Sequence, residues 1–473
     1  MWRTVRQTRD FQRRLMCPPI ELHFKQPFAL LAVDTLRIVR SIFKMISPME
    51  SKVKQKLVIG LLVLILQSVA VSAWAGDAWP QFRGPTSDGH SDAKEVPIAW
   101  SEKTNIKWKT EIPGQGWSSP VVLGGQVWMT TALDEGKSLR AICVDQESGK
   151  LIHNIEVFHV ANPSNKHKFN SYASPTPVLE KGRAYICFGA NGSVCIDSAT
   201  GKNIWENHEL NLDHMNGAGS SPVIFKDMYL LCCDGIDVQY VAAVDKNTGK
   251  TIWTTKRSVS FDGVAPDVRK AYNTPIVIHN EGHDELISIG AHRVYSYDVV
   301  SGKELWYCDH PGFSCVSQPL FADGRIYISS SFTKPVLMAI RTDGTGDVTK
   351  THIAWEFKKG VPCRSTPVIA GEGNKKLIFM VTDDGIAHCI RAEDGEQLWQ
   401  QRVGSGFSAS PLLIGGNVYF FSEKGTSTVV KAGDKLEIVE QSNTLDEGCM
   451  GTPAVVGKAL YLRTKTHLYR IEK

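Results

Sequence analysis

One short phrase recurs eight times along this chain of 473 residues: a serine, threonine or glutamine, then a proline, then an apolar run. Successive prolines of the phrase are 42 to 57 residues apart. A fixed period of this length is typical of repeat architectures, in which each unit buries its apolar face against its neighbours. The eight prolines are Pro120, Pro177, Pro222, Pro275, Pro319, Pro367, Pro411 and Pro453.

The second half of each repeat has its own pattern. An apolar strand ends in Asp, a turn ends in Gly-Lys, and a Trp stands four residues after the Gly, as in AVDKNTGKTIW at residues 243–253. Asp can bond its own turn backbone, and Gly supplies the positive φ that reverses the chain. The pattern predicts two short strands joined by a tight turn in every unit.

These units predict an all-β fold, an eight-bladed β-propeller of four-stranded blades, because a closed ring leaves only short protected edges. A lone Trp strand at residues 106–109 precedes the first phrase, whereas the last unit, residues 451–472, has no Trp strand after it. We therefore expect the Trp108 strand to complete the last blade. The alternative is an open array with two exposed edges.

The chain carries a candidate export signal before the repeats. Lys52, Lys54 and Lys56 precede the apolar run at 57–71, and Ala73-Trp74-Ala75 offers a small-residue cleavage site. This order predicts a signal peptide over residues 49–75 and a periplasmic or secreted protein without a membrane span after cleavage. A retained anchor is the alternative.

Two further segments flank the signal. Residues 1–48 are Arg-rich and lack the repeat, so we expect a non-structural extension with Met49 as the true start, or else a long leader. Residues 76–100 contain WPQFRGPTSDGHS, rich in Pro and Gly. Its Trp79 and Phe82 favour burial, which predicts a loop packed across the ring of residues 101–473 in preference to a solvated linker.

Composition limits the classes of partner that this chain could bind. The chain is 42% hydrophobic and 22% charged, with a formal net charge of +4, so nothing indicates nucleic-acid binding. We expect a monomer. Ten cysteines follow Ala75 without a CxxC pair; in an exported protein they could form disulfides, but their spacing favours buried small hydrophobes.

Two of the repeats carry a family likeness. AVDKNTGKTIW and CIDSATGKNIW (residues 195–205) resemble the repeat of the pyrroloquinoline-quinone (PQQ) family, and the likeness covers nearly all of residues 101–473. That family includes quinoprotein alcohol dehydrogenases and the outer-membrane assembly factor BamB. WPQFRGP followed by CDGIDVQYVAAVDKNTGK is most similar to secreted PQQ-repeat proteins of planctomycetes, some related to kinase-linked propellers.

The resemblance implies two cofactors for an enzyme of this family, PQQ and calcium. Such enzymes hold calcium with oxygen ligands and usually place a disulfide between adjacent cysteines against the quinone. Cys232 and Cys233 match that pair. They lie in the strand-like run MYLLCCDG, where their side chains should point to opposite faces, and a regular strand opposes the strained ring. No calcium-ligand pattern accompanies them, and the metal ligands and catalytic residues stay unknown.

The candidate site is the polar and aromatic set just before each phrase, which should surround one mouth of the channel. Such a cluster could bind a small polar ligand, a peptide loop or a sugar, or hold only water. Asp234 and Asp237 could orient it or cap a turn. The set is Trp117, His167, Asn170, Tyr172, His214, Asn216, Tyr272, Asn273, Gln318, Arg364 and Phe407.

Three functions follow as hypotheses. The first is an exported, non-catalytic binding or assembly scaffold for an envelope protein or a small polar ligand. The second is a PQQ and calcium-dependent alcohol or sugar dehydrogenase. The third is a ligand sensor linked to a signalling partner such as a kinase. No GxSxG, HExxH or kinase motif is present in the sequence, so function must be argued from a site.

Overall fold

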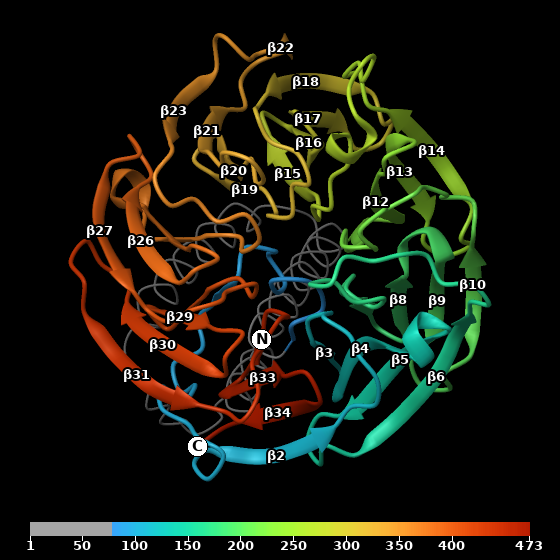
Figure 1. Cartoon of the computed structure of the whole chain (residues 1–473), viewed down its shortest axis with the longest axis vertical. Helices are drawn as coiled ribbons and strands as arrows, with labels where there is room; N and C mark the ends of the chain where they lie inside the picture. The colour runs from blue at the N-terminus through green and yellow to red at the C-terminus, as the bar shows by residue number, and fades with distance from the viewer. Residues whose placement is uncertain (1–77) are drawn as a thin grey trace, which may run out of the picture. The chain divides into compact units, whose positions relative to one another are not determined.

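The computed structural model describes residues 78–473 as eight antiparallel sheets of four strands arranged in a ring (Figure 1). The predicted eight-bladed β-propeller is confirmed. The signal peptide and the extension before it lie outside the described residues. Within residues 78–473, no helix is long and apolar enough to cross a bilayer.

Blades 1 to 4 follow one another along the chain, each numbered from the channel outward. Blade 4 gains a fifth strand at its outer edge, β22 (Gly346–Asp347), which pairs parallel to β18. The strands are β3 (Val121–Leu123), β4 (Gln126–Leu133), β5 (Ser138–Asp145) and β6 (Leu151–His159); β7 (Val178–Glu180), β8 (Arg183–Cys187), β9 (Ser193–Asp197) and β10 (Asn203–Asn207); β11 (Val223–Phe225), β12 (Met228–Asp234), β13 (Gln239–Asp245) and β14 (Thr251–Lys256); β15 (Ile276–Asn280), β16 (His283–Ile289), β17 (Arg293–Asp298) and β18 (Glu304–Asp309).

Blades 5 to 8 complete the ring, and short 3₁₀ turns occur at Asp134–Gly136, Gly189–Asn191, Pro266–Val268 and Gly373–Lys375. The strands are β19 (Leu320–Ala322), β20 (Arg325–Ser329), β21 (Leu337–Arg341) and β23 (Ile353–Phe357); β24 (Val368–Ala370), β25 (Leu377–Val381), β26 (Ile386–Arg391) and β27 (Gln397–Arg402); β28 (Leu412–Ile414), β29 (Asn417–Phe421), β30 (Thr426–Lys431) and β31 (Ile438–Thr444), with β1 (His90–Ser91) added to β28; β32 (Ala454–Val456), β33 (Ala459–Arg463), β34 (His467–Ile471) and β2 (Ile106–Glu111).

The Asp-Gly-Trp pattern serves both the turn and the contact between blades. Asp245 accepts a hydrogen bond from the Thr248 backbone N–H at 2.8 Å, and Gly249 has a φ of +75°. A Cβ at Gly249 would lie 2.8 Å from the Trp205 indole of the preceding blade. The Trp205 indole N–H also donates, at 2.8 Å, to the carbonyl of Lys246, which lies in the same blade as Gly249. Glycine is therefore required both for the turn and for close docking of the preceding blade.

The first and last parts of the chain share blade 8. Strand β2 pairs antiparallel with β34, with Trp108 opposite Arg470, and the Trp108 indole N–H donates to the Gln146 carbonyl of blade 1 at 3.2 Å. The predicted closure by the Trp108 strand is therefore confirmed. The core lies between neighbouring sheets: Tyr185 and Trp205 of blade 2, for example, pack with Tyr229 of blade 3.

Residues 78–100 form a segment that we call the N-terminal strap, and it crosses the ring (Figure 1). Trp79 forms a bridge with Val122 of blade 1, and Pro80 accepts a hydrogen bond from the Leu179 N–H of blade 2 at 2.8 Å. Arg83 is fully buried and donates to the Thr366 carbonyl next to blade 6 at 3.0 Å. The strap therefore spans the channel from blades 1 and 2 to blade 6.

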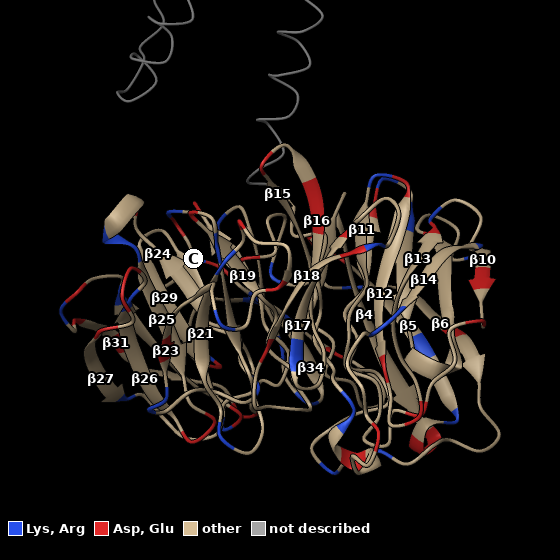
Figure 2. Ribbon diagram, turned by 90° about the horizontal axis from the view of Figure 1, so that it is seen from above, with Lys and Arg blue, Asp and Glu red and all other residues tan. Residues whose placement is uncertain are grey.

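Charged residues of both signs are interspersed in the side view (Figure 2). That view shows no large face of one sign, in keeping with the formal charge of +4.

Candidate binding site in the axial channel

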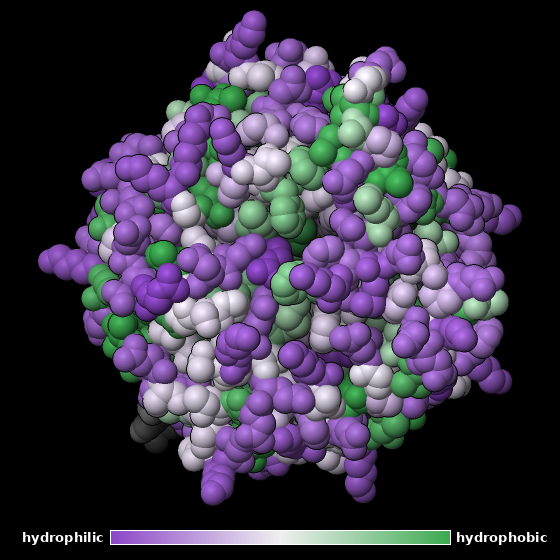
Figure 3. All heavy atoms as spheres, in the orientation of Figure 1, coloured by the Kyte–Doolittle hydropathy of each residue, from purple (hydrophilic) through white to green (hydrophobic). Residues whose placement is uncertain are grey.

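A cavity of about 700 Å³ lies on the ring axis, and the space-filling view shows a hollow near the centre of the ring (Figure 3). Phe82 of the strap contributes to its lining, and since the strap crosses the channel, it obstructs that end. The opposite end is a mouth built from the loops that precede the inner strands. Aromatic residues of the lining are Phe82, Trp117, Phe169, Tyr272, Phe313 and Phe332.

A ring of hydroxyls surrounds the cavity at the position before seven of the eight phrase prolines. Each hydroxyl oxygen accepts a hydrogen bond from the backbone N–H of the corresponding residue in the preceding blade, at 2.8 to 3.0 Å. We call these seven residues the hydroxyl belt. They are Ser119, Thr176, Ser221, Thr274, Thr366, Ser410 and Thr452, and all seven line the cavity.

The belt has one interruption. Its eighth position is Gln318, which donates its own backbone N–H to Thr366 at 2.8 Å but offers no hydroxyl to Thr274. Its side-chain oxygen is buried and has no hydrogen-bond partner in the described part of the chain. The link from Thr452 to Ser119, at 2.9 Å, joins blade 8 to blade 1, so the belt is continuous across the closure of the ring.

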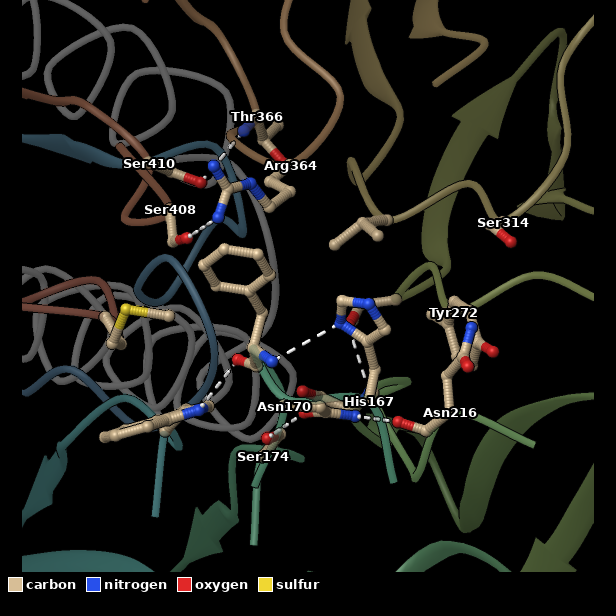
Figure 4. Close-up of a pocket in the computed structure, with 18 of the residues that line it drawn as sticks. His167, Asn170, Ser174, Asn216, Tyr272, Ser314, Arg364, Thr366, Ser408 and Ser410 are labelled. Atoms are coloured by element: carbon tan, nitrogen blue, oxygen red, sulfur yellow. Dashed lines mark hydrogen bonds between the residues drawn. The ribbon is translucent and has the colours of Figure 1, made fainter. Parts of the chain in front are cut away.

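The loop of residues 160–177 reaches over the mouth from between β6 and β7. The Trp117 indole donates to the Phe169 carbonyl of this loop at 3.1 Å. The loop's own Asn170 side-chain amide donates to the Asn216 carbonyl at 2.8 Å (Figure 4). The Phe169 ring is 54% exposed and lies 5.6 Å from the Arg364 guanidinium, which comes from the blade 6 side. Phe169 therefore partly covers the mouth.

The charges of the mouth are paired with one another. Arg364 donates to Ser408 at 2.8 Å (Figure 4). It also donates to Asp383 at 3.1 Å and to Glu423 at 3.0 Å. The buried Lys270 forms an ion pair with Asp267. Both carboxylates that line the cavity, Asp267 and Asp383, are thus already bound to a cation.

The structure brings together six of the residues expected at the mouth and places five elsewhere. Asn273 bonds the Ile289 backbone, Phe407 lies in a hydrophobic core, and Tyr172 packs on Gly136; Gln318 is buried in the ring wall, as described above, and His214 lies behind the mouth. The six that line the cavity are Trp117, His167, Asn170, Asn216, Tyr272 and Arg364.

His214 lines a separate small cavity of about 20 Å³. Its Nε2 accepts the Ala190 N–H at 3.2 Å, while Nδ1 is buried and has no partner among residues 78–473. Burial lowers the pKa of His214 to about 4, against a smaller opposing effect of Asp213 and Asp237, so the imidazole is neutral at pH 7.

Asp234 and Asp237 do not orient the mouth cluster. Asp234 is buried and forms a two-point ion pair with Arg257, at 2.9 and 2.6 Å, while Asp237 accepts the Asp213 backbone N–H at 2.8 Å. Both are structural.

The two adjacent cysteines lie in the regular strand β12. Cys232 faces the cluster with Tyr295 and Cys233 the cluster with Tyr185, so their side chains point to opposite faces of the sheet. Both are free thiols. The disulfide that the family resemblance implied for Cys232 and Cys233 is therefore not formed in this structure, because a pleated strand separates the sulfurs.

The donor set does not fit PQQ with calcium. Calcium takes six to eight oxygen ligands, yet the two lining carboxylates are occupied by Lys270 and Arg364. Among residues 78–473, no group of three or more His, Cys, Asp or Glu side chains is arranged to hold a metal ion. The platform of paired cysteines is also missing from the described cavity lining.

Sequence reasoning missed the belt and several other residues that line the cavity. The belt hydroxyls were visible in the phrase itself as seven Ser or Thr residues among eight. Phe169, Lys270 and Phe332 carry no local signal, because they reach the axis from loops whose paths depend on the closed ring.

Comparison with known proteins agrees with the fold. The chain is 22% identical over 335 residues to the tetrathionate hydrolase of Acidithiobacillus ferrooxidans, covering 64% of this chain and 61% of that protein. It is 24% identical over 208 residues to the outer membrane protein assembly factor BamB of Yersinia pestis, covering 40% and 49%. The chain thus spans about half to three fifths of the length of these curated relatives.

Solved structures and a family model extend the comparison. A europium-containing methanol dehydrogenase superposes with a TM-score of 0.57 at 12% identity, over 82% of this chain and 89% of that one, which shows a shared fold. The family model described as outer membrane protein assembly factor BamB matches residues 91–230 and 237–473. Because these segments make up most of the chain, the protein belongs to this family of PQQ-like repeat β-propellers.

Proposed function

We propose that this protein is an exported, non-catalytic binding scaffold that holds a polar ligand or a partner segment in its axial cavity. The proposal rests on a difference between two kinds of group that line the cavity. The aromatic rings and the belt hydroxyls are open to an occupant, whereas both carboxylates are held by cations. Pockets with apolar walls and a few directed polar groups favour binding.

The same pairing argues against acid–base chemistry. A general base must reach a substrate proton within hydrogen-bond distance, but Asp383 is engaged by Arg364 at 3.1 Å and Asp267 by Lys270. His167 uses its Nδ1 to accept the Phe169 N–H at 3.3 Å. Both carboxylates and the Nδ1 atom of His167 therefore already take part in contacts within the lining.

Export and an assembly role rest on two further observations. The basic, apolar and small-residue order of residues 52–75 supports export. The matched family and the Yersinia pestis relative are described as an outer membrane protein assembly factor, which supports a scaffold that binds an envelope partner.

Turnover assays with the full chain test the proposal. We expect no reduction of an artificial electron acceptor when PQQ, calcium and an alcohol are added, and no hydrolysis of tetrathionate, the compound that the Acidithiobacillus ferrooxidans relative is named for. Turnover in either assay would contradict a non-catalytic scaffold.

Binding is tested by thermal shift against sugars, carboxylates and short peptides. We expect at least one class to stabilise the protein, and Phe169→Ala to remove that stabilisation because its ring lies over the mouth. Ile252→Ala is a matched control, since Ile252 is exposed on the outer strand β14 and away from the cavity lining. A shift retained in Phe169→Ala would place the binding elsewhere.

A further inference from the structure

The belt hydroxyls have a shared chemical property. Each oxygen accepts a backbone N–H, and a hydroxyl also carries one O–H donor. In the described part of the chain, none of the seven belt hydroxyls donates to a protein acceptor. Accepting a hydrogen bond polarises a hydroxyl and strengthens it as a donor. The belt therefore presents a ring of unused, polarised O–H donors to the cavity.

Two buried arginines lie at the ends of one arc of this belt. Arg83 donates to the Thr366 carbonyl at 3.0 Å and to the Pro367 carbonyl at 2.6 Å. Arg463 donates to the Ser118 hydroxyl at 2.9 Å and to the Thr130 carbonyl at 2.7 Å. Between these contacts run four consecutive belt residues, which we call the cationic arc: Thr366, Ser410, Thr452 and Ser119.

Neither guanidinium is neutralised by an ion pair. Within residues 78–473, Arg83 and Arg463 form no salt bridge with a carboxylate, and Arg83 Nε and Arg463 Nε and Nη2 are buried without partners. A buried charge acts over a longer range than an exposed one because little solvent screens it. The cationic arc is thus positively polarised, in contrast to the paired charges of the mouth.

We infer that the cationic arc binds an oxyanion, such as a sulfate, phosphate or carboxylate group, inside the axial cavity. The arc supplies what such a group needs, several converging O–H donors and a positive field. The opposite arc, Thr176, Ser221 and Thr274, has the same hydroxyls but neither arginine, and it ends at the Gln318 interruption. The inference deepens the proposed function by naming the class of ligand.

Isothermal titration of the full chain with sulfate and, separately, with acetate tests this inference, at an ionic strength held constant with chloride. We expect saturable binding at one site. If sulfate alone binds, the ligand is an inorganic oxyanion; if acetate also binds, a carboxylate qualifies.

The belt provides its own matched variants. Thr366→Val and Thr452→Val should each weaken binding roughly tenfold or more, since each removes a hydrogen bond to a charged group. Thr274→Val removes the same hydroxyl from the opposite arc, with the same loss of an acceptor for a neighbouring N–H, and should leave affinity within about twofold. Thr366→Ser, which keeps the hydroxyl, should restore binding.

Three results would overturn the inference. Equal losses in both arcs would show that the arginines do not select the site. An absence of saturable binding by both anions would refute an oxyanion site altogether, while stabilisation by neutral sugars or peptides would still leave the proposed scaffold standing. A crystal soaked in selenate should place the selenium against the cationic arc, and selenium found elsewhere would refute it.

Discussion

Arg257 and Arg463 are almost equally inaccessible, yet their surroundings differ. Arg257 is clasped by Asp234 at two points and packs on Tyr295, 4.8 Å from the ring centre. Burial alone would lower the pKa of Arg257, but the charge of Asp234 raises it well above its usual value. Among residues 78–473, Arg463 has no such carboxylate, and burial lowers its pKa to about 9. Arg257 therefore stabilises the fold through an ion pair, whereas the positive charge of Arg463 is not paired with a carboxylate among residues 78–473.

The largest expected effect comes from breaking the buried ion pair between Arg257 and Asp234. Asp234→Asn leaves Arg257 as an uncompensated buried cation, which should cost about 3–5 kcal/mol of unfolding free energy. Urea denaturation measures it, with Asp145→Asn as a control at an exposed turn. A loss below about 1 kcal/mol would mean that the clasp contributes little and that the contrast with Arg463 is unfounded.

Acid pH probes another buried group, His214, which forms no ion pair among residues 78–473. His214 has a folded pKa of about 4, against 6.5 for an ordinary histidine, so the unfolded chain binds more protons between these values. The contribution of neutral His214 to the unfolding free energy is therefore fully present above pH 6.5 and is lost as the pH falls to about 4. The loss is at most about 1.4 kcal/mol per pH unit for this residue.

Replacing the imidazole checks the origin of that loss. Thermal melts of His214→Gln should show a flatter profile than wild type between pH 6.5 and 4. His310, whose pKa burial lowers to about 3, retains its own share of the acid sensitivity. An unchanged slope in His214→Gln would assign the effect to other groups.

A smaller effect is expected from Arg463 itself. Arg463→Met replaces a fully buried cation that has no counter-charge in the described part of the chain, so the unfolding free energy should stay within about 1 kcal/mol of wild type or rise. Affinity for sulfate should nevertheless fall. A loss as large as that of Asp234→Asn would show that Arg463 is a structural residue like Arg257.

The smallest effect concerns the mouth. Arg364 is partly exposed, with 23% of its side chain accessible, and pairs in such settings contribute at most about 1 kcal/mol. Arg364→Gln should therefore melt close to wild type while changing ligand binding at the mouth. A large drop in melting temperature would place Arg364 with Arg257, among the arginines that hold the ring.

The sequence predicted the ring because its determinants are local. Asp245, Gly249 and Trp253 lie within one short turn and strand, and the missing Trp strand of the last unit could be matched with Trp108 by counting. The polar mouth was partly predicted for the same reason, since residues such as Trp117 and Tyr272 immediately precede the phrases.

The remainder of the site depends on contacts between distant residues. Arg83 and Thr366 are 283 residues apart, and Arg463 and Thr130 are 333 apart, so nothing in either neighbourhood of the sequence indicates the pairing. Phe169 reaches Arg364 only because a loop between blades 1 and 2 spans the mouth. The belt residues are part of the repeated phrase, but the hydrogen bonds that their hydroxyls accept between blades become apparent only once the blades are placed side by side.

The pairing of β2 with β34 has a consequence for synthesis. The strand at 106–111 cannot pair until residues 467–471 have been synthesised. Until then an unpaired edge persists at each end of the growing polypeptide, open to association with other chains. A nascent chain that stalls before residues 467–471 would expose both edges to association, so a cell that makes this protein has reason to shield it until the ring closes.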